Sequence, residues 1–428
     1  MRNYEKIKLL FDISRFGSVW IDGSKKDIRG IYRVVLELAK NLSKEESLDL
    51  AFTSLSDKKI CGASQIYHKK SDLRDISFVP PSLSYSQYIL ARFAQIYKKY
   101  TKLQSKLQFK RILNIHSTSK TTHQYSGIEI KNPSMLNYDI IHLPFFVKTN
   151  IKEIPFRTLI TIHDLIPILY PTPEHIELTQ FIEAKLKELT PRHWIHCISE
   201  STRKDLLKLN LDIDPQKVFV VPNGVSDFFY KIDKENAKKI LDKYNITNDY
   251  IITLSTIQKR KNIENAIKAF HNIHSNYPDL KYIIVGYFSD SYLQVKELIN
   301  KYKLNNHIIL LGHIPDEDIR ALYSMARIFL FTSFYEGFGL PPLEAMACGL
   351  PVVASNTSSI PEVVGESGLL IDPNDVSDIA NKLNIILKDS KLCKKLSQKS
   401  LEQSRKFTWQ NTTHKLTEYY TKMIEQDS

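Results

Sequence analysis

Cysteine is scarce and scattered in this chain of 428 residues. Its four cysteines, Cys61, Cys197, Cys348 and Cys393, lie far apart and form no C-x-x-C pair. Domains held by disulfides carry closely spaced cysteines, and thiolate metal sites usually carry C-x-x-C pairs. The sequence therefore predicts neither a disulfide framework nor a thiolate metal site, and it favours a reducing compartment.

Long apolar runs are also absent. No window of 18 apolar residues occurs, and charged residues interrupt the apolar stretch within residues 1–12. A membrane-spanning helix needs about 20 mainly apolar residues, and a secretory signal needs an uninterrupted apolar segment. We therefore expect a cytoplasmic protein that is neither exported nor membrane-spanning.

Two common nucleotide-binding fingerprints are missing as well. The chain contains neither G-x-x-x-x-G-K-[ST] nor G-x-G-x-x-G. The first pattern cradles phosphates in many ATPases, and the second binds dinucleotides. Their absence argues against ATPase and dinucleotide chemistry.

Acidic residues are missing from one long stretch. Residues 76–128 contain no Asp or Glu but eight Lys or Arg, in a chain whose net charge is +12. Such a surplus favours polyanionic partners, such as nucleic acid, anionic lipid or phosphates. Within this acid-free stretch, the apolar residues of 88–111 recur three and four positions apart, and basic residues lie beside them on the same helical projection. This pattern predicts a basic amphipathic helix. This helix could pack on its own domain, form a coiled coil or lie on an anionic membrane surface.

Short β-branched runs alternate with helical patterns from about Asp249 onward. Strands are expected at residues 250–254, 282–285, 307–311, 328–331 and 352–354, and helices at 262–275, 290–302 and 317–325. The first half repeats the theme more loosely, with strands at 7–11, 50–53, 140–143, 159–162 and 194–198. This alternation is typical of parallel sheets built from βαβ units. We predict two α/β domains, 1–225 and 226–408, and a final helix over about 409–428.

Residues 334–349 form the most informative stretch, F-Y-E-G-F-G-L-P-P-L-E-A-M-A-C-G. A strand is expected before it, so its pattern is strand, glycine loop, helix. Pro341 and Pro342 suit the first turn of a helix, and glycines allow the backbone to approach a ligand closely. Free amides at such a helix start attract a phosphate or sugar hydroxyls.

Two carboxylates, Glu336 in this loop and Glu344 in the helix, are eight residues apart. Ionised carboxylates only accept hydrogen bonds, which suits them to pairs of vicinal hydroxyls. They would bracket a polyol such as a ribosyl-diphospho-sugar. The alternative is that the glycines merely make a turn and both carboxylates are solvated.

Two further segments follow expected strands. Residues 255–262 read S-T-I-Q-K-R-K-N, and residues 161–167 read T-I-H-D-L-I-P. Taken alone, the K-R-K run is typical of a solvated charge cluster, and a histidine at a strand end is typical of a structural residue.

Together these segments resemble the retaining glycosyltransferases of family 4, whose signature is a pair of glutamates separated by seven residues. The resemblance continues through S-I-P-E-V-V-G at 359–365 and G-L-L-I-D-P at 368–373. It extends from near residue 28 to beyond 373 and is missing over about 44–135. It implies a GT-B fold, in which two Rossmann-like doubly wound domains face each other across a cleft. The second domain would bind the nucleotide-sugar and the first the acceptor.

The resemblance also implies roles for individual residues. Glu344 would bind the ribose hydroxyls, Glu336 the sugar, and His163 would lie near the sugar's reacting carbon. Arg260 and Lys261 would stabilise the leaving diphosphate, together with helix-start amides, without a metal or other cofactor. The remaining donor-site residues that it implies are Thr256, Gly337, Phe338, Gly339 and Leu340. A weaker match at residues 30–33 corresponds to a glycine loop that faces the acceptor.

The implied function is transfer of a hexose such as mannose to a glycan acceptor, lipid-linked, in bacterial surface polysaccharide synthesis. The enzyme would work at the inner face of the cytoplasmic membrane and bind no nucleic acid. The alternatives are a non-catalytic protein that binds nucleic acid or an anionic surface, and a GT-B phosphorylase. Two D-x-D triplets, Asp212 with Asp214 and Asp316 with Asp318, could suggest a metal site, but their contexts suit a loop and a helix start.

Overall fold

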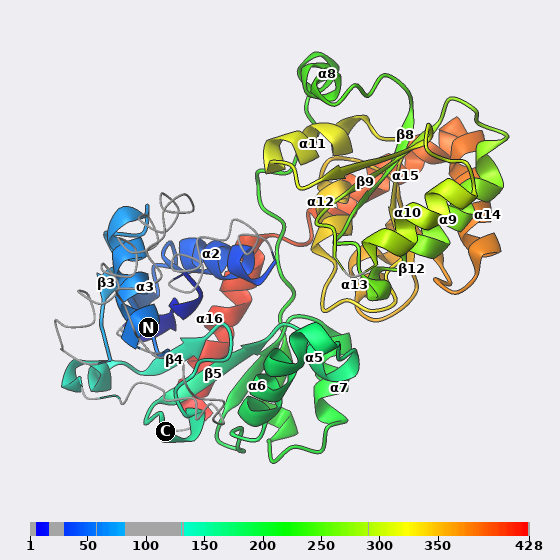
Figure 1. Ribbon diagram of the computed structural model, residues 1–428. Coiled ribbons are helices and arrows are strands. Elements are labelled where there is room, and N and C mark those ends of the chain that lie inside the picture. Colours follow the sequence, from blue (N-terminus) through cyan, green and yellow to red (C-terminus); the bar gives the residue numbers. More distant parts are fainter. Residues whose placement is uncertain are drawn as a thin grey trace, which may run out of the picture.

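The computed structural model describes residues 6–16, 30–56, 58–81, 130, 132–289 and 291–426. These residues form two separate parallel sheets with helices packed around each (Figure 1). The basic helix expected at 88–111 lies outside the described residues, so it stays a prediction. In the part of the chain that is described, no helix is long and apolar enough to cross a membrane.

The first sheet is formed by the amino-terminal half of the chain. In the described part, its strand order is β3-β2-β1-β4-β5-β6-β7, and all neighbouring strands pair in parallel. The strands are β1 Ile7–Asp12, β2 Leu48–Thr53, β3 Ser77–Phe78, β4 Ile140–Leu143, β5 Arg157–Ile162, β6 Trp194–Cys197 and β7 Val218–Val220. The helices around it include α2 Ile31–Leu42, α3 Lys58–Lys70, α5 Ile166–Leu169, α6 Ile176–Leu186 and α7 Glu200–Leu207.

The second sheet repeats the same arrangement. Its order among the described residues is β10-β9-β8-β11-β12-β13, again all parallel. The strands are β8 Tyr250–Leu254, β9 Lys281–Val285, β10 Ile308–Gly312, β11 Ile328–Phe331, β12 Val352–Ser355 and β13 Leu369–Ile371. Its helices include α8 Lys234–Lys243, α9 Ile263–His274, α10 Tyr292–Lys301, α11 Asp316–Met325, α12 Leu340–Ala347, α13 Ile360–Val364, α14 Val376–Lys388 and α15 Ser390–Ser404.

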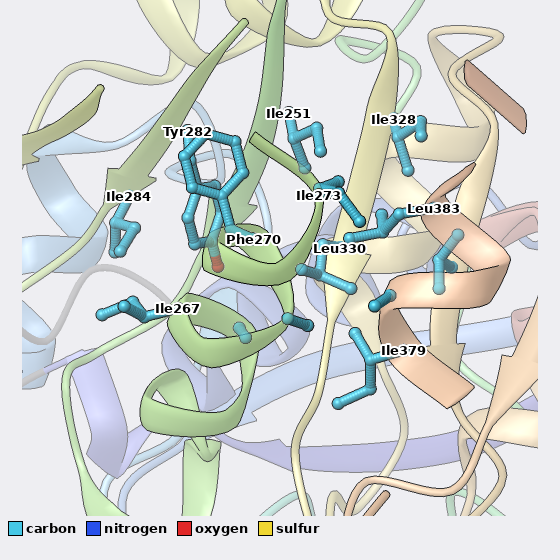
Figure 2. Packing of buried hydrophobic residues seen from close by; sticks show 14 of the residues in the cluster. Ile251, Ile267, Phe270, Ile273, Tyr282, Ile284, Ile328, Leu330, Ile379 and Leu383 are labelled. Carbon is cyan, nitrogen blue, oxygen red and sulfur yellow. The ribbon is translucent and has the colours of Figure 1, made fainter. Parts of the chain in front are cut away.

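Apolar residues on both faces of each strand explain why helices cover both faces of the second sheet. Successive side chains of a strand point to opposite faces, and here Ile251 and Ile252 belong to different core clusters. Figure 2 shows one of these clusters, where Phe270 of α9 and Leu383 of α14 pack beside Ile251 and Leu330. A strand that is apolar on both faces is typical of a parallel sheet with two helical layers.

The helix α16, Trp409–Gln426, packs on the first sheet although it follows the second domain in the chain. Its side chains Leu416, Tyr420 and Met423 are buried in the first domain's core, beside α2 (Figure 1). The chain therefore passes between the domains twice. The two crossings touch, because the backbone N–H of Val225 donates to the carbonyl of Phe407 at 2.9 Å.

A chain of buried polar side chains joins α16 to three strands of the first sheet. Tyr420 lies 2.7 Å from Nδ1 of His142, whose Nε2 lies 2.7 Å from the Thr161 hydroxyl. That hydroxyl lies 3.0 Å from Nδ1 of His196, and Nε2 of His196 lies 2.7 Å from the carbonyl of Val221. Burial lowers the pKa of both imidazoles, to about 4 for His196, so both are neutral near pH 7 and each carries one N–H. Because a carbonyl only accepts, His196 Nε2 donates to Val221, so Thr161 donates to His196, His142 donates to Thr161 and Tyr420 donates to His142.

Candidate functional site

A cavity of about 410 Å³ lies between the two domains. The first domain lines it with α2 and the segment after β5, and the second domain lines it with the loops after β8 and β11. Every residue that the sequence analysis named for the site lines this cavity, namely His163, Thr256, Arg260, Lys261, Glu336, Gly337, Phe338, Gly339, Leu340 and Glu344. The fold thus brings together residues that are up to 181 positions apart, from His163 to Glu344.

The loops after β8 and β11 meet where the strand order of the second sheet reverses. β8 and β11 are neighbours in the sheet, and in open α/β sheets ligands bind in the crevice at such a switch point. The loops are fixed to each other, because the Phe334 backbone N–H donates to the Arg260 carbonyl at 2.9 Å. In return, the Arg260 guanidinium donates to the Tyr335 carbonyl.

Three charged side chains, each 12–14% exposed, form a largely buried group at this crevice. Lys261 Nζ lies 2.6 Å from Glu336 Oε1, and Arg260 lies 3.3 Å from the same oxygen. Burial raises the pKa of Glu336, but the charges of Lys261 and Arg260 outweigh it and lower the pKa below its ordinary value. Glu336 is therefore ionised. Burial also lowers the pKa of Lys261, an effect that the charge of Glu336 opposes. With Lys261 protonated, the group carries one net positive charge.

The glycine loop is held in shape by the segment after β12. The Ser358 hydroxyl accepts a hydrogen bond from the Glu336 backbone N–H at 2.9 Å. The Ser359 hydroxyl lies within donating distance of two carbonyls, those of Glu336 at 2.9 Å and Phe338 at 2.8 Å. Gly339 then has a φ of 114°, which favours glycine, and α12 begins at the next residue with prolines in its first turn. The expected strand, glycine loop and helix are all present.

Gly337 marks a close approach between the domains. A Cβ atom at this position would lie 2.4 Å from the carbonyl oxygen of His163 and 2.7 Å from Cβ of Asp164. The Gly337 carbonyl also accepts a hydrogen bond from Ser199 at 2.7 Å. From the sequence, the glycines of this loop are expected to make room for a ligand, but Gly337 makes room for the first domain's backbone.

His163 is buried and neutral. Its Nε2 lies 2.6 Å from the carbonyl of Pro144, so this nitrogen carries the proton and Nδ1 is an acceptor. Burial, only partly offset by that hydrogen bond, lowers the pKa of His163 to about 4. Near neutral pH the side chain can accept a hydrogen bond from a sugar hydroxyl, but it supplies no positive charge.

Glu344 has a partner that the sequence analysis did not predict. Arg33, on α2 of the first domain, forms ion pairs with both Glu344 on α12 and Asp316 at the start of α11. Spacing could not reveal this contact, because Arg33 and Glu344 are 311 residues apart. The G-I-Y-R match at residues 30–33 was the available signal, but it suggested only an acceptor-side loop.

The D-x-D triplets are engaged in other contacts. Asp316 pairs with Arg33, whereas Asp318 pairs with Lys243 at 2.7 Å. Asp214 accepts a hydrogen bond from the backbone N–H of Gln216 at 2.9 Å. Within the described ranges, no group of three or more His, Cys, Asp or Glu side chains could hold a metal ion.

Comparison with known proteins links these features to a family. Residues 233–403 match the family model described as "Glycosyl transferases group 1". The O-antigen chain mannosyltransferase B of Escherichia coli is 32% identical over 282 residues, which cover 64% of this chain and 72% of that protein. The serotype-specific mannosyltransferase WbdA of Escherichia coli is 31% identical over 328 residues, which cover 72% of this chain. This chain spans only 40% of the length of WbdA.

A solved structure shows the same fold over the whole chain. It is a glycosyltransferase from Rickettsia africae with a TM-score of 0.65 and 20% sequence identity, and the match covers 98% of this chain and 99% of that one. Together with the two parallel sheets, this similarity confirms the predicted fold of two Rossmann-like domains.

Proposed function

Since the chain belongs to the glycosyl transferases group 1 family, as its sequence predicted, we propose that it transfers a hexose from a nucleoside-diphosphate sugar to a glycan hydroxyl. The names of its relatives favour mannose as the sugar and bacterial O-antigen synthesis as the setting. The observation that carries the proposal is the meeting of a cationic group and two carboxylates in one interdomain cavity.

The charges at the crevice suit the departure of a diphosphate. The bond between the anomeric carbon and the phosphate oxygen breaks, and the acceptor oxygen forms a new bond to that carbon. The acceptor's proton passes to the departing phosphate oxygen on the same face, which retains the configuration. Lys261 and Arg260 stabilise the negative charge that develops on the diphosphate, because they are already fixed in a buried site.

The other cavity residues suit hydroxyl groups. Glu336 is ionised and accepts hydrogen bonds from the hexose, while Glu344 accepts them from the ribose of the donor. His163 accepts through Nδ1 and lies next to the hexose. Thr256 and residues 337–340 line the rest of the donor site.

The acceptor reaches the cavity from the first domain. Its lipid anchor places the enzyme at the inner face of the cytoplasmic membrane, where residues 88–111 contact anionic lipid. The acid-free stretch that contains them supports this part of the proposal. No metal ion takes part, because the two cations supply the positive potential.

Ligand binding and product analysis test the proposal. Thermal denaturation is measured with UDP, GDP and dTDP, since a ligand of the native state raises its apparent stability. We expect one nucleoside diphosphate to raise the melting temperature, and the matching nucleotide-sugar to donate its hexose to a glycan with retained configuration. A chain that binds none of the three would contradict the proposal, and so would an inverted product.

A further inference from the structure

The nucleotide end of the cavity is completed by the first domain. Glu344 is 5% exposed, and its carboxylate is paired with Arg33, which extends from α2 across the domain boundary. The guanidinium is held from several sides by the second domain. It also pairs with Asp316, and it lies over the ring of Phe229 at 5.5 Å.

We propose that Arg33 is a positioning residue that holds the Glu344 carboxylate in place for the ribose hydroxyls, so that the donor site is complete only when the two domains are together. This inference rests on the proposed function, in which the ligand is a ribonucleotide. It goes further by giving the acceptor domain a part in donor affinity.

The geometry of the ion pairs supports this role. A guanidinium is a planar fork, and Arg33 uses different terminal nitrogens, Nη1 for Glu344 and Nη2 for Asp316. With both nitrogens engaged, the side chain cannot rotate away from Glu344 without losing Asp316. A charge-assisted hydrogen bond of this kind also leaves lone pairs on the carboxylate, which can accept more than one donor. Arg33 and two ribose hydroxyls can therefore be bound to Glu344 together.

A second contact between the domains offers a matched control. The Glu362 carboxylate of the second domain accepts hydrogen bonds from the backbone N–H groups of Glu200 and Ser201 at the start of α7, both at 2.8 Å. Glu362 does not line the cavity. Replacing it weakens the contact between the domains but leaves Glu344 untouched.

The test compares ribonucleotides with their dideoxy analogues. Calorimetry measures binding of UDP and GDP, and of their 2′,3′-dideoxy forms, to the full chain and to Arg33→Leu, Arg33→Lys and Glu362→Gln. We expect Arg33→Leu to weaken the ribonucleotide about tenfold, the scale of one charge-assisted hydrogen bond, and to leave the dideoxy form within about twofold. Arg33→Lys, which keeps the charge without the fork, should give an intermediate loss, and Glu362→Gln almost none.

Three outcomes would overturn the inference. One is equal loss of the ribonucleotide and the dideoxy form in Arg33→Leu, which would show a general disturbance of the site. Another is an equal loss in Glu362→Gln, which would show that domain contact alone matters. The third is unchanged binding in both Arg33 variants. If the unaltered chain bound neither UDP nor GDP, the proposed ribonucleotide would itself be wrong, and the inference would fall with it. Arg33→Lys decides the matter if Arg33→Leu does not fold.

Discussion

Ionisable side chains behave differently in two regions of the molecule, the core around Asp12 and His196 in the first domain and the Lys261–Arg260–Glu336 group in the second. In the first region burial dominates, so it raises the pKa of Asp12 to about 6 and lowers that of His196 to about 4, each toward the neutral form. In the second region opposite charges are paired. Lys261 and Arg260 lower the pKa of Glu336 despite its burial, whereas burial lowers the pKa of Lys261 and the charge of Glu336 only partly offsets it.

This difference matches what the two sides of a transfer reaction require. A departing diphosphate gains charge, and fixed charges in a buried site stabilise it best. A sugar hydroxyl has no charge to stabilise at rest, so neutral hydrogen-bonding groups are sufficient beside it. Under the proposed function, Lys261 and Arg260 face the diphosphate, and the neutral imidazole of His163 accepts a hydrogen bond from the hexose.

The largest expected effect follows from removing a charge in the second domain. Lys261→Ala should lower turnover by about 10²–10³, the scale for losing one fixed group that stabilises the transition state. Initial rates at saturating donor measure it, and Lys239→Ala is the control, since Lys239 forms an exposed pair with Glu235 on α8. Unchanged turnover in a folded Lys261→Ala enzyme would show that the diphosphate does not bind beside Lys261.

Smaller effects are expected from replacing Glu344 and Glu336, and they should differ between nucleotide affinity and transfer rate. Glu344→Ala loses a ribose contact, so it should weaken the free nucleoside diphosphate about tenfold, as expected for charge-assisted hydrogen bonds. Glu336→Ala should lower transfer yet keep nucleotide affinity within about threefold, because the freed Lys261 still faces the diphosphate. Calorimetry and rate measurements on both variants check this. Equal losses of affinity would refute the division between sugar and ribose.

Mild acid should destabilise the first domain, because its buried His196 is neutral in the folded state. The ordinary histidine pKa is 6.5, and that of buried His196 is about 4, so between these values the unfolded chain binds more protons than the folded one. The stabilisation is complete above about pH 6.5 and is lost as the pH falls toward 4, on the order of 3 kcal/mol for one such histidine.

Urea unfolding at pH 7, 6 and 5 measures this loss. Trp194 and Trp409 are both buried in the first domain's core, so tryptophan fluorescence reports on that domain. His196→Gln should reduce the dependence on pH, while His414→Gln, whose side chain is 72% exposed on α16, should not. A pH dependence that persists in full in His196→Gln would assign it to other groups.

The smallest expected effect is none at all. Excess EDTA should leave the transfer rate unchanged, because Arg260 and Lys261 supply the positive potential at the diphosphate. The assay is repeated with added Mn²⁺ or Mg²⁺. Loss of activity in EDTA and its recovery with either ion would show that the cations of the second domain are not sufficient. Asp316 and Asp318 would then be the first residues to replace.

Much of the fold could be predicted from the sequence because its strands are long enough to show a pattern. The strand expected at 250–254 is β8, and the one expected at 328–331 is β11. The strand β3 has only two residues, too few for any alternation to appear. The candidate site was predicted through the family resemblance, whose motifs follow β5 in the first sheet and β8 and β11 in the second.

What could not be predicted is how the domains meet. Gly337 looked like a ligand-approach residue, and only the path of the backbone shows that it contacts His163. The pairing of Arg33 with Glu344 depends on the relative position of two sheets, which no local pattern encodes. Asp316 lies at the start of a helix, as the sequence predicts, but its ion pair with Arg33 of the first domain could not be predicted.

The return of α16 to the first sheet has consequences for synthesis and for proteolysis. During translation the first sheet emerges early, but Leu416, Tyr420 and Met423 arrive only after the whole second domain has been made. The core of the earlier domain is therefore completed later than that of its neighbour. Because the chain crosses between the domains twice, a single cut at one crossing, such as within residues 226–233, would leave the two domains covalently linked through the other.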